Sequence, residues 1–123
     1  MKAVVIEAIY VGEDAQNIEL KDWSIRVSMN LDRNNTPVFS GYLAGVRGTP
    51  FGKRECYPFV IDQKGRVDFG SSFDPDEGEQ APEVDARYGA TNIFRTKIEV
   101  GEFFNMTEDD EENTYQIRRV IPV

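Results

Sequence analysis

The chain has 123 residues, of which 40% are hydrophobic and 29% charged, and its formal net charge is −8. This length and composition are typical of one globular domain with a single core, and they exclude an intrinsically disordered chain. The chain has no histidine and one cysteine, which excludes Ser–His and Cys–His hydrolase designs, histidine-ligated zinc sites and an intramolecular disulfide.

The first half of the chain is predicted to begin with a strand over residues 2–11 and a hairpin. Apolar and polar residues alternate from Trp23 to Leu31, which indicates a strand with one buried face. Turn-forming residues occupy 32–37, and residues 38–46 are predicted to form the partner strand. Gly41 and Gly45 lie on one side of that strand, which is typical of a bulge, a bend or a close crossing of backbones.

Two more hairpins are predicted further along the chain. Residues 56–61 and 67–69 flank a turn in which Gly65 supplies a left-handed residue. Pro58 cannot donate to a ladder, so its strand is expected at a sheet edge or at a bulge. In the third hairpin, residues 94–100 form one strand and 114–121 return as its partner. The alternation fails at Arg118 and Arg119, which predicts a bulge or a half-buried Arg119.

Helical signals are confined to one short stretch. Pro82 at a first turn and Gly89 at a C-terminal cap predict at most one short helix near residues 82–88. The pattern as a whole predicts one all-β domain over residues 1–123, an antiparallel small barrel or sandwich of six to seven strands. Glu7 interrupts the first apolar run, and no stretch approaches the roughly 18 apolar residues of a membrane span, so we expect no signal peptide, no membrane contact and a cytoplasmic location.

Charge is distributed unevenly along the chain. Residues 1–73 carry nine acids and nine bases, whereas residues 74–123 carry thirteen acids and five bases. The excess lies in two predicted acidic loops, 74–85 and 107–113, which either remain simply solvated or meet a basic surface. If residues 93–106 form one straight strand, the loops lie roughly 40 Å apart at about 3.3 Å per residue. A break at Gly101 would instead bring them to one surface.

Four further kinds of site were considered: a phosphate-binding loop, a reactive cysteine, a calcium loop and a carboxylate catalytic site. Residues 48–54 lack the spacing of a phosphate-binding Walker loop, so an ordinary loop is favoured. Cys56 is predicted to be a buried structural thiol. Asp74, Asp76 and Asp85 fit three places of a calcium loop, but the glycine is displaced, so no metal and no cofactor are predicted. Catalysis by carboxylates alone, with Glu55, Asp62 and Asp68 as members, is left as a third alternative.

The preferred hypothesis is a non-catalytic binding protein, not an enzyme, whose acidic C-terminal half docks on a basic partner protein, as an inhibitor, immunity protein or nuclease antagonist does. The candidate partner-binding residues are Asp74, Asp76, Glu77, Glu79, Glu83, Asp85, Glu108, Asp109, Asp110, Glu111 and Glu112. The alternative is a small barrel that binds single-stranded nucleic acid or another anion through Arg47, Phe51, Lys53, Arg54 and Tyr57. The net charge argues against direct nucleic-acid binding, and a homodimer built through open strand edges is compatible with the sequence.

Overall fold

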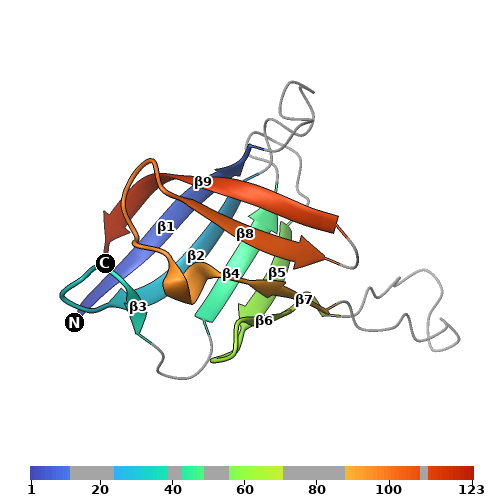
Figure 1. Ribbon diagram of the computed structural model, residues 1–123, viewed down its shortest axis with the longest axis horizontal. Coiled ribbons are helices and arrows are strands. Elements are labelled where there is room, and N and C mark those ends of the chain that lie inside the picture. The colour runs from blue at the N-terminus through green and yellow to red at the C-terminus, as the bar shows by residue number, and fades with distance from the viewer. Residues whose placement is uncertain (12–23, 39–42, 49–55, 71–87, 109–110) are drawn as a thin grey trace, which may run out of the picture.

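The computed structural model describes residues 1–11, 24–38, 43–48, 56–70, 88–108 and 111–123 (Figure 1). Its strands are β1 (Lys2–Tyr10), β2 (Ser24–Leu31), β3 (Pro37–Val38), β4 (Leu43–Gly48), β5 (Cys56–Ile61), β6 (Arg66–Asp68), β7 (Tyr88–Thr91), β8 (Phe103–Glu108) and β9 (Glu111–Pro122). Within these ranges the helical element is a single 3₁₀ turn, η2 (Ile93–Arg95). No helix in the described part of the chain is long and apolar enough to cross a membrane.

The strands form a closed antiparallel barrel. Hydrogen-bonded neighbours follow the order β1-β9-β8-β7-β6-β5-β4-β2, and β1 pairs with β2 to close the ring, while β3 adds a short ninth strand beside β2. The all-β prediction is confirmed, with eight barrel strands and one extra strand in place of six to seven. Residues 82–87 of the predicted short helix lie outside the described residues, and Tyr88 begins β7.

The core fills the barrel with alternate residues of its strands. Side chains such as Ile6, Val27, Ile61, Phe104 and Ile117 are almost fully buried, as the period of two requires. Gly45 of β4 leaves room for the Phe59 side chain, because a Cβ there would lie 2.3 Å from that ring. The close approach is thus made by a side chain and not by a crossing backbone, and Gly41 lies outside the described residues.

Two local predictions about irregular strands have different outcomes: the bulge at Arg118 is confirmed, and the edge position of the Pro58 strand is not. In the pairing of β1 with β9, Glu7 faces Arg119 and Ala8 faces Ile117, so Arg118 is the extra residue of a bulge. Pro58 pairs with Val46 of β4, whereas β6 pairs only with Val60 and Ile61 of β5. β5 is thus not the predicted edge strand, because it lies between β4 and β6 in the ring. Pro58 lies beyond the residues that pair with β6, so no described ladder bond on that side needs its missing N–H.

Residues 94–100 do not form the predicted strand. After η2 the chain crosses one end of the barrel, and Ile93, Thr96 and Ile98 are buried there. Gly101, with φ of 95°, then reverses the chain into β8. The alternation is real, but it buries apolar side chains over the barrel end instead of within the wall. The third hairpin therefore joins β8 to β9, and the predicted acidic loop 107–113 is mostly strand, with only residues 109–110 outside the described ranges.

The two ends of the barrel differ. At one end, which we call the capped end, the turn Asp62–Arg66 meets Thr91 at the end of β7, and the turn Asp32–Thr36 meets Ile98 of the following segment, residues 92–102. We call the other end the acidic end; it contains the carboxyl ends of β1, β4, β6 and β8 and the amino ends of β2, β5, β7 and β9 (Figure 1).

Candidate functional site

The strand register brings the flanks of both acidic stretches to the acidic end. Gly89 at the start of β7 pairs with Glu108 at the end of β8, and Glu108 in turn pairs with Glu111 at the start of β9. Asp68 of β6 pairs with Tyr88 of β7. The sequence between β6 and β7, which contains the first acidic stretch, therefore begins and ends at strands that neighbour the second stretch.

The barrel body and the connecting sequences carry very different charge. The described residues contain nine acids and ten bases, a formal net charge of +1. The remaining sequence carries the other thirteen acids and four bases, and all of these lie in 12–23, 49–55, 71–87 and 109–110. Each of these four stretches joins strand termini at the acidic end. The whole negative excess of the protein is thus attached to one end of the barrel.

The individual acidic candidates do not all have the same surroundings. Glu111 and Glu112 are exposed on the first turn-proximal positions of β9. Glu108 points into the barrel and forms an ion pair with Arg47, so its charge is compensated internally. The other candidates, Asp74, Asp76, Glu77, Glu79, Glu83, Asp85, Asp109 and Asp110, lie outside the described residues.

The Arg47–Glu108 ion pair spans the interior of the barrel. Arg47 of β4 and Glu108 of β8 are separated by three strands on one side of the ring and three on the other. One guanidinium nitrogen donates to Glu108 Oε2, and the second donates to Oε1 at 3.3 Å, which gives a two-point contact. The two side chains are only 13% and 16% exposed. The pair therefore ties opposite walls of the barrel together at its acidic end.

Aromatic rings pack around this ion pair and the nearby core. The guanidinium carbon of Arg47 lies 4.9 Å from the Phe69 ring centroid, a cation–π distance. Tyr115 stacks on Phe104 with centroids 5.7 Å apart and meets Tyr10 edge-on at 6.2 Å. Burial raises the pKa of Tyr115 above its ordinary value of 10; the charge of Arg47 opposes that shift, and Glu108 and Tyr10 add to it. Tyr115 is thus held as a neutral phenol.

The alternative anion-binding set is not brought together by the described residues. Arg47 faces the barrel interior and Glu108, so it does not supply an outward cation. Tyr57 pairs with Arg47 through the backbone of β5, but its side chain, with Phe51, Lys53 and Arg54, lies outside what the structure describes, as does the side chain of Cys56.

The inward direction of Arg47 has a signal in the sequence, namely its place in a row of core positions. Leu43, Gly45 and Arg47 share one face of β4 because they are two residues apart, and Leu43 and Gly45 are core positions. An arginine in that row requires a buried carboxylate partner.

The carboxylates of the described residues do not gather around a metal position. Within the described ranges, no group of three Asp, Glu or Cys side chains converges on a cation position. Asp62 accepts hydrogen bonds from the backbone N–H groups of Lys64 and Arg66, both at 2.9 Å, and from the Arg66 side chain. These bonds, that from the Arg66 backbone first, lower the pKa of Asp62 below its ordinary value of 3.8. Asp62 is thus used to hold its turn in place.

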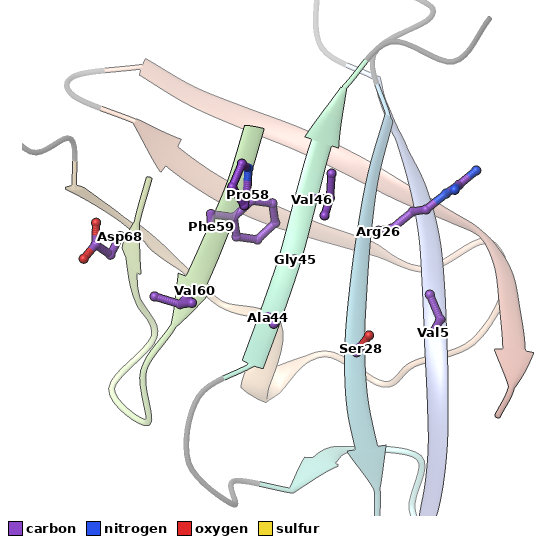
Figure 2. A pocket seen from close by; sticks show the side chains of 10 residues that line it. All are labelled: Val5, Arg26, Ser28, Ala44, Gly45, Val46, Pro58, Phe59, Val60 and Asp68. Atoms are coloured by element: carbon purple, nitrogen blue, oxygen red, sulfur yellow. The ribbon is translucent and has the colours of Figure 1, made fainter. Parts of the chain in front are cut away.

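A shallow depression lies on the outer wall of the barrel instead of inside it. It has a volume of about 530 Å³ and is lined by residues of β1, β2, β4, β5 and β6 (Figure 2). The barrel interior at the same height is filled by the core.

No protein-family model matches this chain, and neither the curated proteins nor the solved structures contain a match to it.

Proposed function

We propose that this protein is a non-catalytic binding protein whose acidic end docks on a basic surface of a partner protein, as inhibitors, immunity proteins and nuclease antagonists do. The observation that carries the proposal is that the segments with the negative excess all join strand termini at one end of a barrel whose described residues sum to a formal charge of +1. The single cysteine and the absence of histidine favour a cytoplasmic binding role over catalysis.

A charge arrangement of this kind favours recognition by long-range electrostatics. The stretches 71–87 and 109–112 together carry ten acids and one base, and they adjoin neighbouring strands. A concentrated field of one sign accelerates association with an oppositely charged surface and disfavours partners of the same sign. Because the rest of the barrel has almost no net charge, the molecule is expected to orient its acidic end toward a basic partner during the encounter.

The structure suggests a matched pair of variants for the test. Glu111→Gln/Glu112→Gln neutralises two exposed acids at the acidic end, whereas Glu99→Gln/Glu102→Gln neutralises two acids of residues 92–102 at the capped end. Both variants change the net charge by the same amount. Any difference between them therefore reports where on the molecule the charge is needed.

The experiment is a salt-dependent affinity capture from host lysate, followed by titration calorimetry with the purified partner. We expect a basic protein whose affinity falls with salt, falls several-fold further in Glu111→Gln/Glu112→Gln, and changes little in Glu99→Gln/Glu102→Gln. Equal losses in both variants would show a response to net charge alone. An affinity that does not change with salt or with either variant would contradict acidic docking.

A further inference from the structure

The outer wall of the barrel carries an apolar strip where exposed strand faces are usually polar. Val46 of β4 and Val60 of β5 are each 38% exposed, and Ala44 and Pro58 are exposed beside them. These side chains line the depression in Figure 2, with Val5 of β1 further along the wall. Exposed apolar side chains gathered on one face are typical of an interaction surface.

The strand register arranges this strip as two short rows across the wall. Arg26, Val46 and Pro58 are paired from β2 to β4 to β5 and form the first row. The second row, toward the capped end, runs from Ser28 through Ala44 and Val60 to Asp68 of β6; these four residues are also paired from strand to strand. The apolar residues therefore occupy the middle of the strip, and Arg26 and Asp68 stand at its two flanks, as Figure 2 shows.

The two flanks have opposite charge. On the β2 side, Glu7 forms ion pairs with Arg26 at 3.2 Å and with Arg119 at 3.3 Å. Two arginines against one glutamate leave one positive charge in excess. On the β6 side, Asp68 accepts a hydrogen bond from the Gly70 backbone and contributes a negative charge. An apolar centre with a positive flank and a negative flank is self-complementary, because a two-fold rotation exchanges the flanks.

We propose that this wall is a dimer interface that binds a second copy of the chain. The two-fold axis lies in the interface between β4 and β5 and close to the strand direction. It places the β4 and β5 side chains of one copy on the β5 and β4 side chains of the other, as in aligned sheet packing. Arg26 of each copy then faces the β6 flank of its partner, offset from Asp68 by two residues, about 7 Å along a strand. A side chain of this length, 64% exposed, spans that offset.

Closure of the barrel favours this route over strand addition. Each of the eight barrel strands pairs with a neighbour on both sides over at least part of its described length, so none of them is a free edge strand for a second copy. The arrangement also places both acidic ends on the same side of the dimer, where they repel each other. The dimer does not depend on the proposed binding of a basic partner.

Charge reversal tests the interface through its symmetry. Arg26→Asp makes both flanks of one copy acidic, and Asp68→Arg makes both flanks basic. Each single variant then opposes like charges twice in its own homodimer, and we expect self-association to weaken at least tenfold. In an equimolar mixture, an acidic copy meets a basic copy at both flanks, so the mixture is expected to recover dimers. Arg95→Asp, an exposed reversal on η2, is the control and is expected to leave dimerisation unchanged.

The measurement is sedimentation equilibrium of each variant and of the mixture, with circular dichroism melts to show that each variant is folded. Recovery of dimers only in the mixture supports the interface, even if one variant is less stable. A wild-type protein that remains monomeric at several hundred micromolar overturns the proposal. Dimers that persist in both single variants also overturn it, since they place the contact elsewhere.

Discussion

At the capped end the barrel is held by backbone hydrogen bonds, whereas at the acidic end it is held across its interior by one pair of charged side chains. The turns that begin at Asp32 and Asp62 have the same geometry: the carboxylate accepts two backbone N–H groups, and the fourth residue, Asn35 or Gly65, has positive φ. No matching backbone strap crosses the described part of the acidic end.

The left-handed residues explain how the capped end is closed. A residue with positive φ turns its carbonyl away from its own turn. The Gly65 carbonyl accepts the Thr91 N–H at 2.8 Å, and the Asn35 carbonyl accepts the Ile98 N–H at 2.8 Å. The segment from Thr91 to Ile98, which crosses the end of the barrel, is thus hydrogen-bonded to both turns. Local turn geometry thus fixes one end of the barrel, while the other depends on long-range charge pairing.

The largest effect is expected from breaking the ion pair. Arg47→Met leaves the largely buried Glu108 without this guanidinium, and we expect the free energy of unfolding to fall by about 3 kcal/mol in urea denaturation. Arg47→Met/Glu108→Leu removes both charges and is expected to lose less than the single variant. Glu108→Leu is the second single variant. If the free energy lost by the double variant equals the sum of the losses of Arg47→Met and Glu108→Leu, the pair does not couple the two walls.

Two glycines with similar φ allow the cost of backbone strain to be measured apart from the cost of a steric clash. Gly65 and Gly70 have φ of 79° and 76°, but a Cβ on Gly65 would lie 2.6 Å from the Thr91 carbonyl oxygen, while one on Gly70 would meet nothing within 4 Å. Gly70→Ala is expected to cost about 1 kcal/mol of unfolding free energy from backbone strain alone. Gly65→Ala is expected to cost about 2–3 kcal/mol, because its Cβ also displaces the Thr91 carbonyl at the end of β7. Equal costs in urea denaturation would show that the contact with Thr91 does not fasten the capped end.

The elements that depend on local pattern were predictable from the sequence. β2 follows its alternation, and the turn at Gly65 follows its glycine. The wrong strand over residues 94–100 has a physical cause: an alternation of buried and exposed residues is equally satisfied by a strap that covers a barrel end. The short strand β7, Tyr88–Thr91, lacks a large apolar inward residue, so no pattern marks it.

The candidate site was predictable only in part. The acidic composition is visible in the sequence, but its concentration at one end depends on the reversal at Gly101. Arg47 and Glu108 are 61 residues apart, and only barrel closure brings their strands to face each other across the interior. The sequence therefore did not show that Arg47 of the anion-binding set and Glu108 of the partner-binding set pair with each other. The outer strip likewise requires the register of four strands.

The smallest effect is a pH dependence confined to the capped end. The hydrogen bonds to Asp62 lower its pKa, so its carboxylate stabilises the folded turn at pH values above its ordinary pKa of 3.8. That contribution is lost as the pH falls through the lowered pKa. Asp62→Asn keeps an acceptor oxygen but lacks the charge, so its midpoint of urea denaturation should lie below that of the wild type at pH 7 and approach it toward pH 2. The amide protons of Lys64 and Arg66, followed by NMR, should shift over the same acidic range in the wild type alone. A midpoint difference that stays constant from pH 7 to pH 2 would contradict this prediction. It would mean that the charge of Asp62 does not contribute to the stability of its turn.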